Sequence, residues 1–216
     1  MQGIPSVAAG LLALLGSAAL ADELPVVKEA RASWRGCVYR FQVLDDSAST
    51  SSEYPSGPPW EKNGKYKLVV QLDPSSFTCR MRAQSVEVSK AFEVPDVAIQ
   101  VSNEGLAVAY SRGAYHPWAN YTRLIDIKRL DPVSLGTLKA TDLYARFGQT
   151  YADYRPGRLT LNALTFYSRS IEVNGGLVGE NMWGGGATQS GTGERFVASY
   201  LDFFGDSPQA PGIVIY

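Results

Sequence analysis

Histidine is the scarcest residue with useful chemistry in this chain, because His116 is its single copy. A zinc site with several imidazole ligands is therefore excluded, and a serine or cysteine nucleophile would need His116 as its general base. Ser190, in Thr188-Gln189-Ser190-Gly191-Thr192, lacks the Gly-x-Ser-x-Gly turn of such hydrolases. We expect no metal, no cofactor and no catalytic residue of these kinds, and we interpret His116 as a loop histidine beside a proline.

Aromatic and polar side chains around His116 offer a different chemistry. The stretch from Tyr110 to Arg123 contains Tyr115, Trp118 and Tyr121 together with asparagine and arginine. An aromatic face flanked by amide and guanidinium donors suits a sugar ring or a small aromatic ligand. The simpler interpretation is that Trp118 and Tyr121 fill one end of the hydrophobic core.

A glycine-rich stretch near 174–193 is the second candidate contact, since it carries Met182 and Trp183 as an apolar tip. Glycine permits unusual backbone conformations, and an apolar loop tip is a typical partner contact. The stretch lacks the lysine and the glycine spacing of phosphate-binding and dinucleotide-binding loops. The simpler interpretation is a long hairpin loop. The candidate ligand-binding residues are thus Tyr115, His116, Trp118, Tyr121 and Trp183.

Carboxylates are the remaining route to catalysis, because a glycosidase needs two of them facing each other across a cleft. Four acidic residues lie near the glycine-rich stretch in sequence, namely Glu172, Glu180, Glu194 and Asp202. A chain with 21 acidic residues offers such groups by chance, so this pattern has little weight. A calcium site at Asp45-Asp46 would lack the usual Asp-x-Asp-x-Asp loop.

Cys37 and Cys79 are the only cysteines, and an even pair in an exported chain predicts a disulfide. Each lies in a stretch where every second residue is apolar, Cys37 to Val43 and Phe77 to Ala83. We therefore expect both cysteines on the apolar faces of strands, joined through the core. The wide spacing and the single histidine disfavour a redox or metal-binding pair.

The first residues predict export. An uncharged run from Ile4 to Leu20 meets the small-x-small pattern Ala19-Leu20-Ala21, which is typical of signal peptides. We expect residues 1–21 to be removed and the protein to be secreted or periplasmic, with no stable transmembrane segment left. A retained membrane anchor is the alternative, which the shortness of the run disfavours. The start, Met1-Gln2-Gly3, lacks the expected positive charge.

Composition narrows the class of protein and of partner. The 20 basic and 21 acidic residues are interspersed and give a net charge of -1, so no stripe of positive charge predicts binding to nucleic acid or to an anionic membrane. With 45% apolar and 19% charged residues, the chain is ordinary globular protein. We expect one domain over 22–216.

Alternating apolar residues and turn-rich connections predict an all-β, mostly antiparallel fold. The expected strands are 33–44, 65–73, 77–89, 97–101, 106–110, 120–130, 136–141, 158–173, 194–204 and 213–216, where 158–173 is either one long strand or a bent pair. The expected connections are a polar lead-in with one helical turn at 22–32, a Ser/Pro-rich loop near 45–64, a loop over 112–118 and a short helix after 141. A phase change past Gln84 predicts a bulge. We favour a β-sandwich, with a lipocalin-like β-barrel as the alternative and at most one or two short helices.

These observations favour an exported, non-enzymatic binding or interaction protein. Its contacts are expected on the aromatic loops around Trp118 and Trp183, with a small ligand, a glycan or another envelope or extracellular protein as the partner. One alternative is a carboxylate-dependent carbohydrate-active enzyme. Another is a structural component of an envelope or surface assembly.

Overall fold

The structure is a computed structural model, and it describes ten segments of the chain. These are residues 23–49, 64–74, 77–116, 119–147, 155–156, 158–178, 182–183, 188–191, 193–205 and 210–216. The predicted signal peptide and most of the predicted Ser/Pro-rich loop lie outside them. Strands dominate in these segments, where the one helical element is a 3-10 turn at Ser47–Ser49, and the predicted all-β class is confirmed. In the described segments, no helix is long and apolar enough to cross a membrane.

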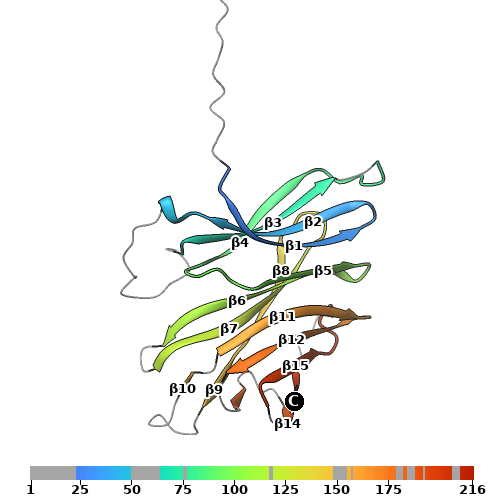
Figure 1. Cartoon of the computed structure of the whole chain (residues 1–216). Coiled ribbons are helices and arrows are strands. Elements are labelled where there is room, and N and C mark those ends of the chain that lie inside the picture. The colour runs from blue at the N-terminus through green and yellow to red at the C-terminus, as the bar shows by residue number, and fades with distance from the viewer. Residues whose placement is uncertain are drawn as a thin grey trace, which may run out of the picture.

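The first sheet is antiparallel, with its four strands in the order β1-β2-β3-β4 (Figure 1). The strands are β1 (Val26–Trp34), β2 (Cys37–Asp45), β3 (Tyr66–Pro74) and β4 (Gln84–Ala91). Every second residue is buried from Cys37 to Val43 in β2 and from Leu68 to Leu72 in β3. Because side chains alternate across a strand, this pattern gives the sheet one apolar face.

The N-terminal strand was not predicted. The polar residues 26–32 belong to β1, which pairs with β2 along its length, and the predicted helical turn is wrong. Its polar character suits an edge strand with one exposed face. Arg35 and Gly36 join β1 to β2 with φ values of 51° and 76°. Positive φ at both residues is typical of the tight hairpin turn that matches strand twist.

The predicted hairpin of 65–73 with 77–89 is confirmed as β3 with β4, but β4 begins only at Gln84. Residues 77–83 have no ladder partner, so Phe77 is fully exposed and Cys79 lies in a connection instead of a strand. A bulge exists in this hairpin, but not at the phase change past Gln84: residues 84–87 pair in register with β3, and the register shifts at Val88, opposite Leu68 and Val69.

The second sheet has nine strands in the order β14-β16-β15-β12-β11-β7-β6-β5, with β8 paired to β7. They are β5 (Val97–Ser102), β6 (Gly105–His116), β7 (Ala119–Leu130), β8 (Thr137–Leu143), β11 (Arg158–Tyr167), β12 (Ser170–Val178), β14 (Thr188–Gly191), β15 (Arg195–Tyr200) and β16 (Gly212–Ile215). A three-stranded sheet, β10-β9-β13, consists of β9 (Ala145–Phe147), β10 (Arg155–Pro156) and β13 (Met182–Trp183). Nearly all pairings are antiparallel, as predicted.

The nine-stranded sheet folds over itself, so the strands stack in layers (Figure 1). β11 pairs with β7 only at Arg158 and Arg123, and it lies across β5 and β6. Alternate residues of β6 therefore face two cores: Leu106, Val108 and Tyr110 pack against the first sheet, whereas Ala107 and Ala109 pack against β11, β12 and β15. This layered arrangement is the predicted sandwich, and the lipocalin-like alternative is not seen among the described strands.

Strand pairing decided the structure of five further stretches for which the sequence had given a prediction. Residues 112–116 continue β6 and do not form a loop, and 145–147 form β9 where a helix was expected; residues 148–154 lie outside the described segments. The stretch 174–178 is part of β12 and not of a glycine-rich loop. For 158–173 the structure has the pair of strands and not the single long strand: β11 and β12 form a hairpin that turns at 168–169. The predicted edge strand 213–216 is β16, which has β15 on one side and β14 on the other.

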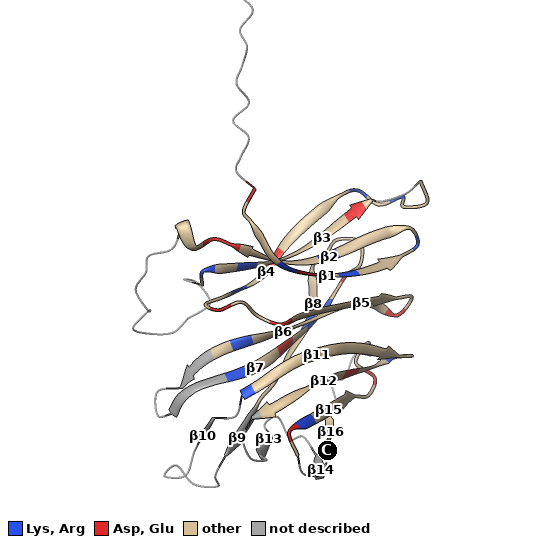
Figure 2. Ribbon diagram, viewed as in Figure 1, with Lys and Arg blue, Asp and Glu red and all other residues tan. Residues whose placement is uncertain are grey.

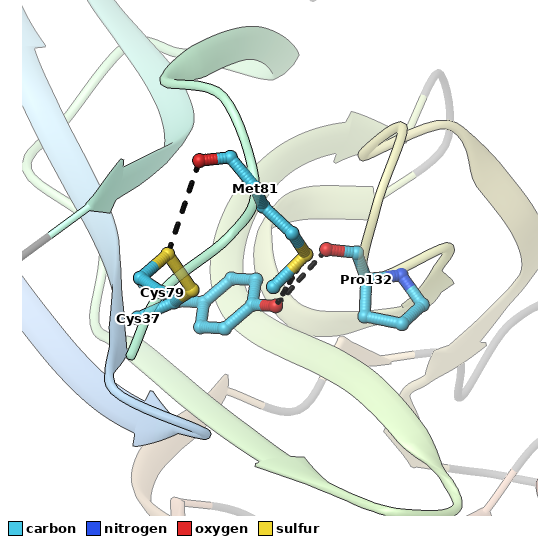
Figure 3. The surroundings of a disulfide bond; sticks show 5 residues. Cys37, Cys79, Met81 and Pro132 are labelled. Carbon is cyan, nitrogen blue, oxygen red and sulfur yellow. Dashed lines mark hydrogen bonds between the residues drawn. A yellow bond between two sulfur atoms is a disulfide. The ribbon is translucent and has the colours of Figure 1, made fainter. Parts of the chain in front are cut away.

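The predicted disulfide joins Cys37 to Cys79, with 4.8 Å between their Cα atoms (Figure 3). Beside it, the hydroxyl of Tyr39 donates to the carbonyl oxygen of Pro132 at 3.0 Å and lies 4.0 Å from the sulfur of Met81. Burial, together with the negative charge of Asp131, raises the pKa of Tyr39. The disulfide therefore ties the β3–β4 connection to β2, next to the turn that follows β7.

Tyr200 of β15 provides a contrasting buried hydroxyl. It is 3% exposed, and in the described part of the chain its oxygen has no hydrogen-bond partner. Burial, and then the charge of Asp142, raises the pKa of this phenol strongly. We expect Tyr200→Phe to raise the free energy of unfolding by about 1 kcal/mol, because an unsatisfied buried polar group is removed.

Tyr39→Phe is the matched control for this substitution. It deletes a hydroxyl that has a partner, so we expect it to lower the free energy of unfolding by about 1 kcal/mol. Urea denaturation of the two variants and the parent measures both changes. A loss of stability in Tyr200→Phe equal to that in Tyr39→Phe would contradict the assignment of an unpartnered hydroxyl.

Candidate functional site

The predicted ligand-binding residues fall at one end of the fold, as far as their backbone is described. Tyr115 and His116 end β6, and Tyr121 lies opposite Tyr115 in β7. Trp183 is in β13, which pairs with β9, and β9 pairs with β10, which contacts β7. Trp118 lies outside the described residues. The two predicted segments thus come near each other, and an aromatic platform there stays a prediction.

Two of the four carboxylates considered at the sequence level have separate partners. Glu172 accepts a hydrogen bond from the hydroxyl of Ser199 at 3.2 Å, and Asp202 forms an ion pair with Arg169 at 2.8 Å. Glu194 is exposed, and Glu180 lies outside the described residues. The groove described next is lined by other acids, Asp126 and Asp142.

A polar groove opens on the face of β6, β7 and β8 that carries Tyr110, and we call it the β6–β8 groove. Its volume is about 390 Å³, which is within the range of small-molecule sites. The lining residues are Tyr110, Arg112, Asp126, Lys128, Ala140, Thr141 and Asp142. Cross-strand register explains the set, since Tyr110 lies opposite Asp126, Asp126 opposite Asp142, and Lys128 opposite Ala140.

A forked ion pair lies in the floor of the groove. Arg112 donates from Nε to Oδ2 of Asp126 at 2.7 Å and from Nη2 to Oδ1 at 3.3 Å. Asp126 is 8% exposed. Two parallel hydrogen bonds fix the relative orientation of the two side chains. Breaking the pair would leave a buried charge without its partner, which is strongly destabilising.

Two further charges line the groove. Lys128 donates to the carbonyl oxygen of Val88 in β4 and lies 5.8 Å from the centroid of the Tyr110 ring, so it connects the groove to the first sheet. Asp142 is exposed, and no described cation pairs with it. It lies directly opposite Asp126 in the ladder, where two like charges disfavour strand pairing. Among the described residues, the groove therefore presents a carboxylate without an ion-pair partner beside a fixed ion pair.

A second polar cluster surrounds Asp96, between the layers. Its carboxylate accepts from Lys28 Nζ at 2.9 Å and from the backbone N–H of Leu161 at 3.3 Å, and Arg123 lies 3.6 Å away. Its own N–H donates to the hydroxyl of Ser111 at 2.7 Å. Burial opposes ionisation of Asp96, but these donors and cations hold its pKa below the ordinary value. The cluster ties β1, β6, β7 and β11 together, and we interpret it as structural.

Sequence reasoning missed the groove because its residues belong to three strands. Arg112 was assigned to a loop. Asp126 and Lys128 are two positions apart, as are Ala140 and Asp142. In a strand this spacing places each pair on one face, but it does not show that the two faces meet. Their meeting depends on the pairing of β7 with β6 and β8. A polar stripe on one face of an otherwise apolar strand is the local pattern that could have indicated it.

No protein-family model, no curated protein and no solved structure matches this chain. The function is therefore argued from the chemistry of the groove.

Proposed function

We propose that this chain is an exported, non-enzymatic binding protein and that its β6–β8 groove holds a small polyhydroxylated ligand such as a saccharide unit. The observation that carries the proposal is the exposed carboxylate of Asp142 beside the fixed pair of Arg112 and Asp126 in a groove of about 390 Å³. Neighbouring hydroxyl groups both donate and accept, so they suit a wall that offers a carboxylate next to guanidinium and ammonium groups.

Each part of the groove has a role in this proposal. Asp142 accepts hydrogen bonds from ligand hydroxyls, Lys128 and Thr141 supply donors, and the ion pair fixes the floor. Tyr110 is 1% exposed, so its ring packs in the core beneath the groove and offers little surface for stacking. An aromatic contact to the ligand, from the predicted residues Tyr115, His116, Trp118, Tyr121 and Trp183, stays a separate prediction.

Export is supported by the disulfide and by the predicted signal peptide. A disulfide that links two segments of the fold is typical of proteins that mature in an oxidising compartment. The partner is then a small molecule or a glycan met outside the cytoplasm, at the cell envelope or beyond it.

A carboxylate-dependent enzyme is the second candidate, and one observation favours it. Asp126 and Asp142 are directly opposite on one face, where side chains in an antiparallel pair lie about 5 Å apart, close to the separation of about 5 to 5.5 Å in retaining glycosidases. Both carboxylate oxygens of Asp126 accept hydrogen bonds from Arg112, however, so neither is available as a nucleophile towards a sugar. Binding accounts better for this geometry.

The proposal is tested by titrating the disulfide-bonded protein with a panel of mono- and oligosaccharides in a calorimeter. We expect saturable binding, weakened at least about tenfold by Asp142→Asn, because hydrogen bonds to a charged group contribute about 1.5–3 kcal/mol. Glu104→Gln, which removes an exposed acid from the β5–β6 turn, is the matched control and should bind as the parent does. Unchanged melting temperatures verify that both variants are folded.

Three results would contradict or redirect the proposal. Absence of binding across the panel, or equal affinity in parent and Asp142→Asn, would remove the groove as the site. Release of shorter saccharides, abolished by Asp126→Asn or Asp142→Asn, would establish the enzyme instead. If Trp118→Ala and Trp183→Ala abolish binding whereas Asp142→Asn does not, the site is at the aromatic end.

A further inference from the structure

A basic and aromatic surface lies where the β1–β2 turn meets the β3–β4 connection, and we propose that it docks the protein on an anionic lipid bilayer. We call this surface the arginine tip, and it consists of Trp34, Arg35, Phe77, Arg80 and Arg82. Figure 2 shows basic residues in both segments, at the same end of the first sheet. The inference is independent of the ligand proposed for the groove.

The disulfide gathers the arginine tip from distant parts of the sequence. Arg35 lies two residues before Cys37, and Arg80 follows Cys79 directly. The Cα atoms of the two cysteines are 4.8 Å apart, and Cys37 also lies opposite Pro74, at the end of β3. The turn and the connection are therefore held side by side, and three arginines that are scattered in sequence share one end of the fold.

The charges of this surface are not neutralised within it. Arg80 and Arg82 are exposed, and neither has an acidic partner in the described part of the chain. The nearby carboxylate of Asp73 is already paired with Arg40 at 2.6 Å. The exposed Glu104 of the adjoining β5–β6 turn offsets one of the three positive charges.

Arg35 and Trp34 are arranged so that the guanidinium keeps its donors. The guanidinium carbon lies 4.3 Å from the centroid of the Trp34 ring, and the indole N–H donates to the side-chain oxygen of Asn103 at 3.1 Å. A cation–π contact does not use up the N–H donors of a guanidinium in hydrogen bonds. These donors suit phosphate oxygens, which arginine binds in a forked geometry.

Phe77 decides between a bilayer and a dissolved polyanion. Its side chain is completely exposed, with a relative exposure of 107%, and it belongs to the same connection as Arg80 and Arg82. A dissolved polyanion would contact the arginines and leave this ring in water. At a bilayer the ring enters the interface while the arginines contact the headgroup phosphates, which combines an apolar and an electrostatic contribution.

The test is co-sedimentation of the disulfide-bonded protein with vesicles of phosphatidylcholine alone and of phosphatidylcholine mixed with phosphatidylglycerol. We expect binding to the mixed vesicles only, and we expect salt to weaken it. Arg80→Gln with Arg82→Gln should weaken partitioning about thirtyfold, since each basic residue near an anionic surface contributes about fivefold. Phe77→Ala should weaken it about tenfold, through the lost burial of the ring.

Two matched controls remove the same kinds of group elsewhere. Arg195→Gln deletes an exposed arginine of β15, and Leu201→Ala deletes an exposed apolar side chain of the turn after it. Both should bind vesicles as the parent does. Cys37→Ala with Cys79→Ala releases the connection at constant net charge and should also weaken binding; if this variant does not fold, the arginine and phenylalanine variants decide.

The inference is overturned if the parent binds both kinds of vesicle equally or binds neither. It is also overturned if the double arginine variant partitions as the parent does. Retention on a sulfated polysaccharide without vesicle binding would overturn it in favour of a dissolved polyanion. Saccharide binding in the groove, measured separately with Asp142→Asn, is unaffected by any of these results.

Discussion

Replacing both cysteines by alanine is expected to lower the free energy of unfolding by about 4 kcal/mol. Cys37 and Cys79 are separated by 42 positions, and the bond restricts the unfolded chain over that loop. In the chain-entropy account, removing a cross-link that closes a loop of this length lowers the free energy of unfolding by about 4 kcal/mol. The expected change is large because the typical free energy of unfolding of a domain is only about 5–15 kcal/mol.

Guanidinium chloride denaturation of the oxidised parent, the reduced parent and Cys37→Ala with Cys79→Ala measures this effect. The reduced parent and the double variant should have similar, lower midpoints. Their denaturant slope should rise, because an unfolded chain without the cross-link exposes more surface. Equal midpoints for oxidised and reduced parent would show that packing around Tyr39 and Pro132 holds the connection without the bond.

Gly175→Ala is expected to lower the free energy of unfolding by about 3 kcal/mol or more. Gly175 lies within β12, between Leu161 of β11 and Phe196 of β15. An added Cβ atom would overlap the carbonyl oxygen of Thr160, and it would lie 2.9 Å from the Thr160 carbonyl carbon and 3.0 Å from the Phe196 ring. These groups belong to the backbone of a paired strand and to the buried core, so they cannot move aside cheaply.

Gly176→Ala is the matched control for that substitution. Its added Cβ atom would lie 2.7 Å from the side-chain oxygen of Thr160, which can rotate away. The cost is then mainly the hydrogen bond from the Gly176 N–H to this oxygen, about 1 kcal/mol. Thermal or urea denaturation compares the two variants, and equal destabilisation would disprove the close backbone approach inferred at Gly175.

Much of the fold was predictable because its determinants are local. The alternation of Tyr66, Leu68, Val70 and Leu72 indicates β3 without reference to any partner. The turn residues Ser102 to Gly105 predict the hairpin of β5 with β6 in the same way. Composition, alternation and turn residues together were sufficient for the all-β sandwich class.

The errors share one physical cause, which is that pairing can override local pattern. Residues 77–83 alternate like a strand but have no neighbouring strand, and the disulfide holds them as a connection. Residues 26–32 are polar and still form a strand because β2 pairs with them. Gly175 and Gly176 lie in a central strand because β11 and β15 flank them and their missing side chains allow close approach.

The sequence by itself determined the class of fold and the identity of the disulfide partners, since alternation is local and two cysteines allow one pair. Only the tertiary structure decided where polar chemistry converges. The register of β7 with β6 and β8 places Arg112, Asp126 and Asp142 in one groove. The approach of the β1–β2 turn to the β3–β4 connection likewise depends on the pairing of β2 with β3 and on the disulfide. Register and packing depend on contacts between residues far apart along the chain, which no local pattern encodes.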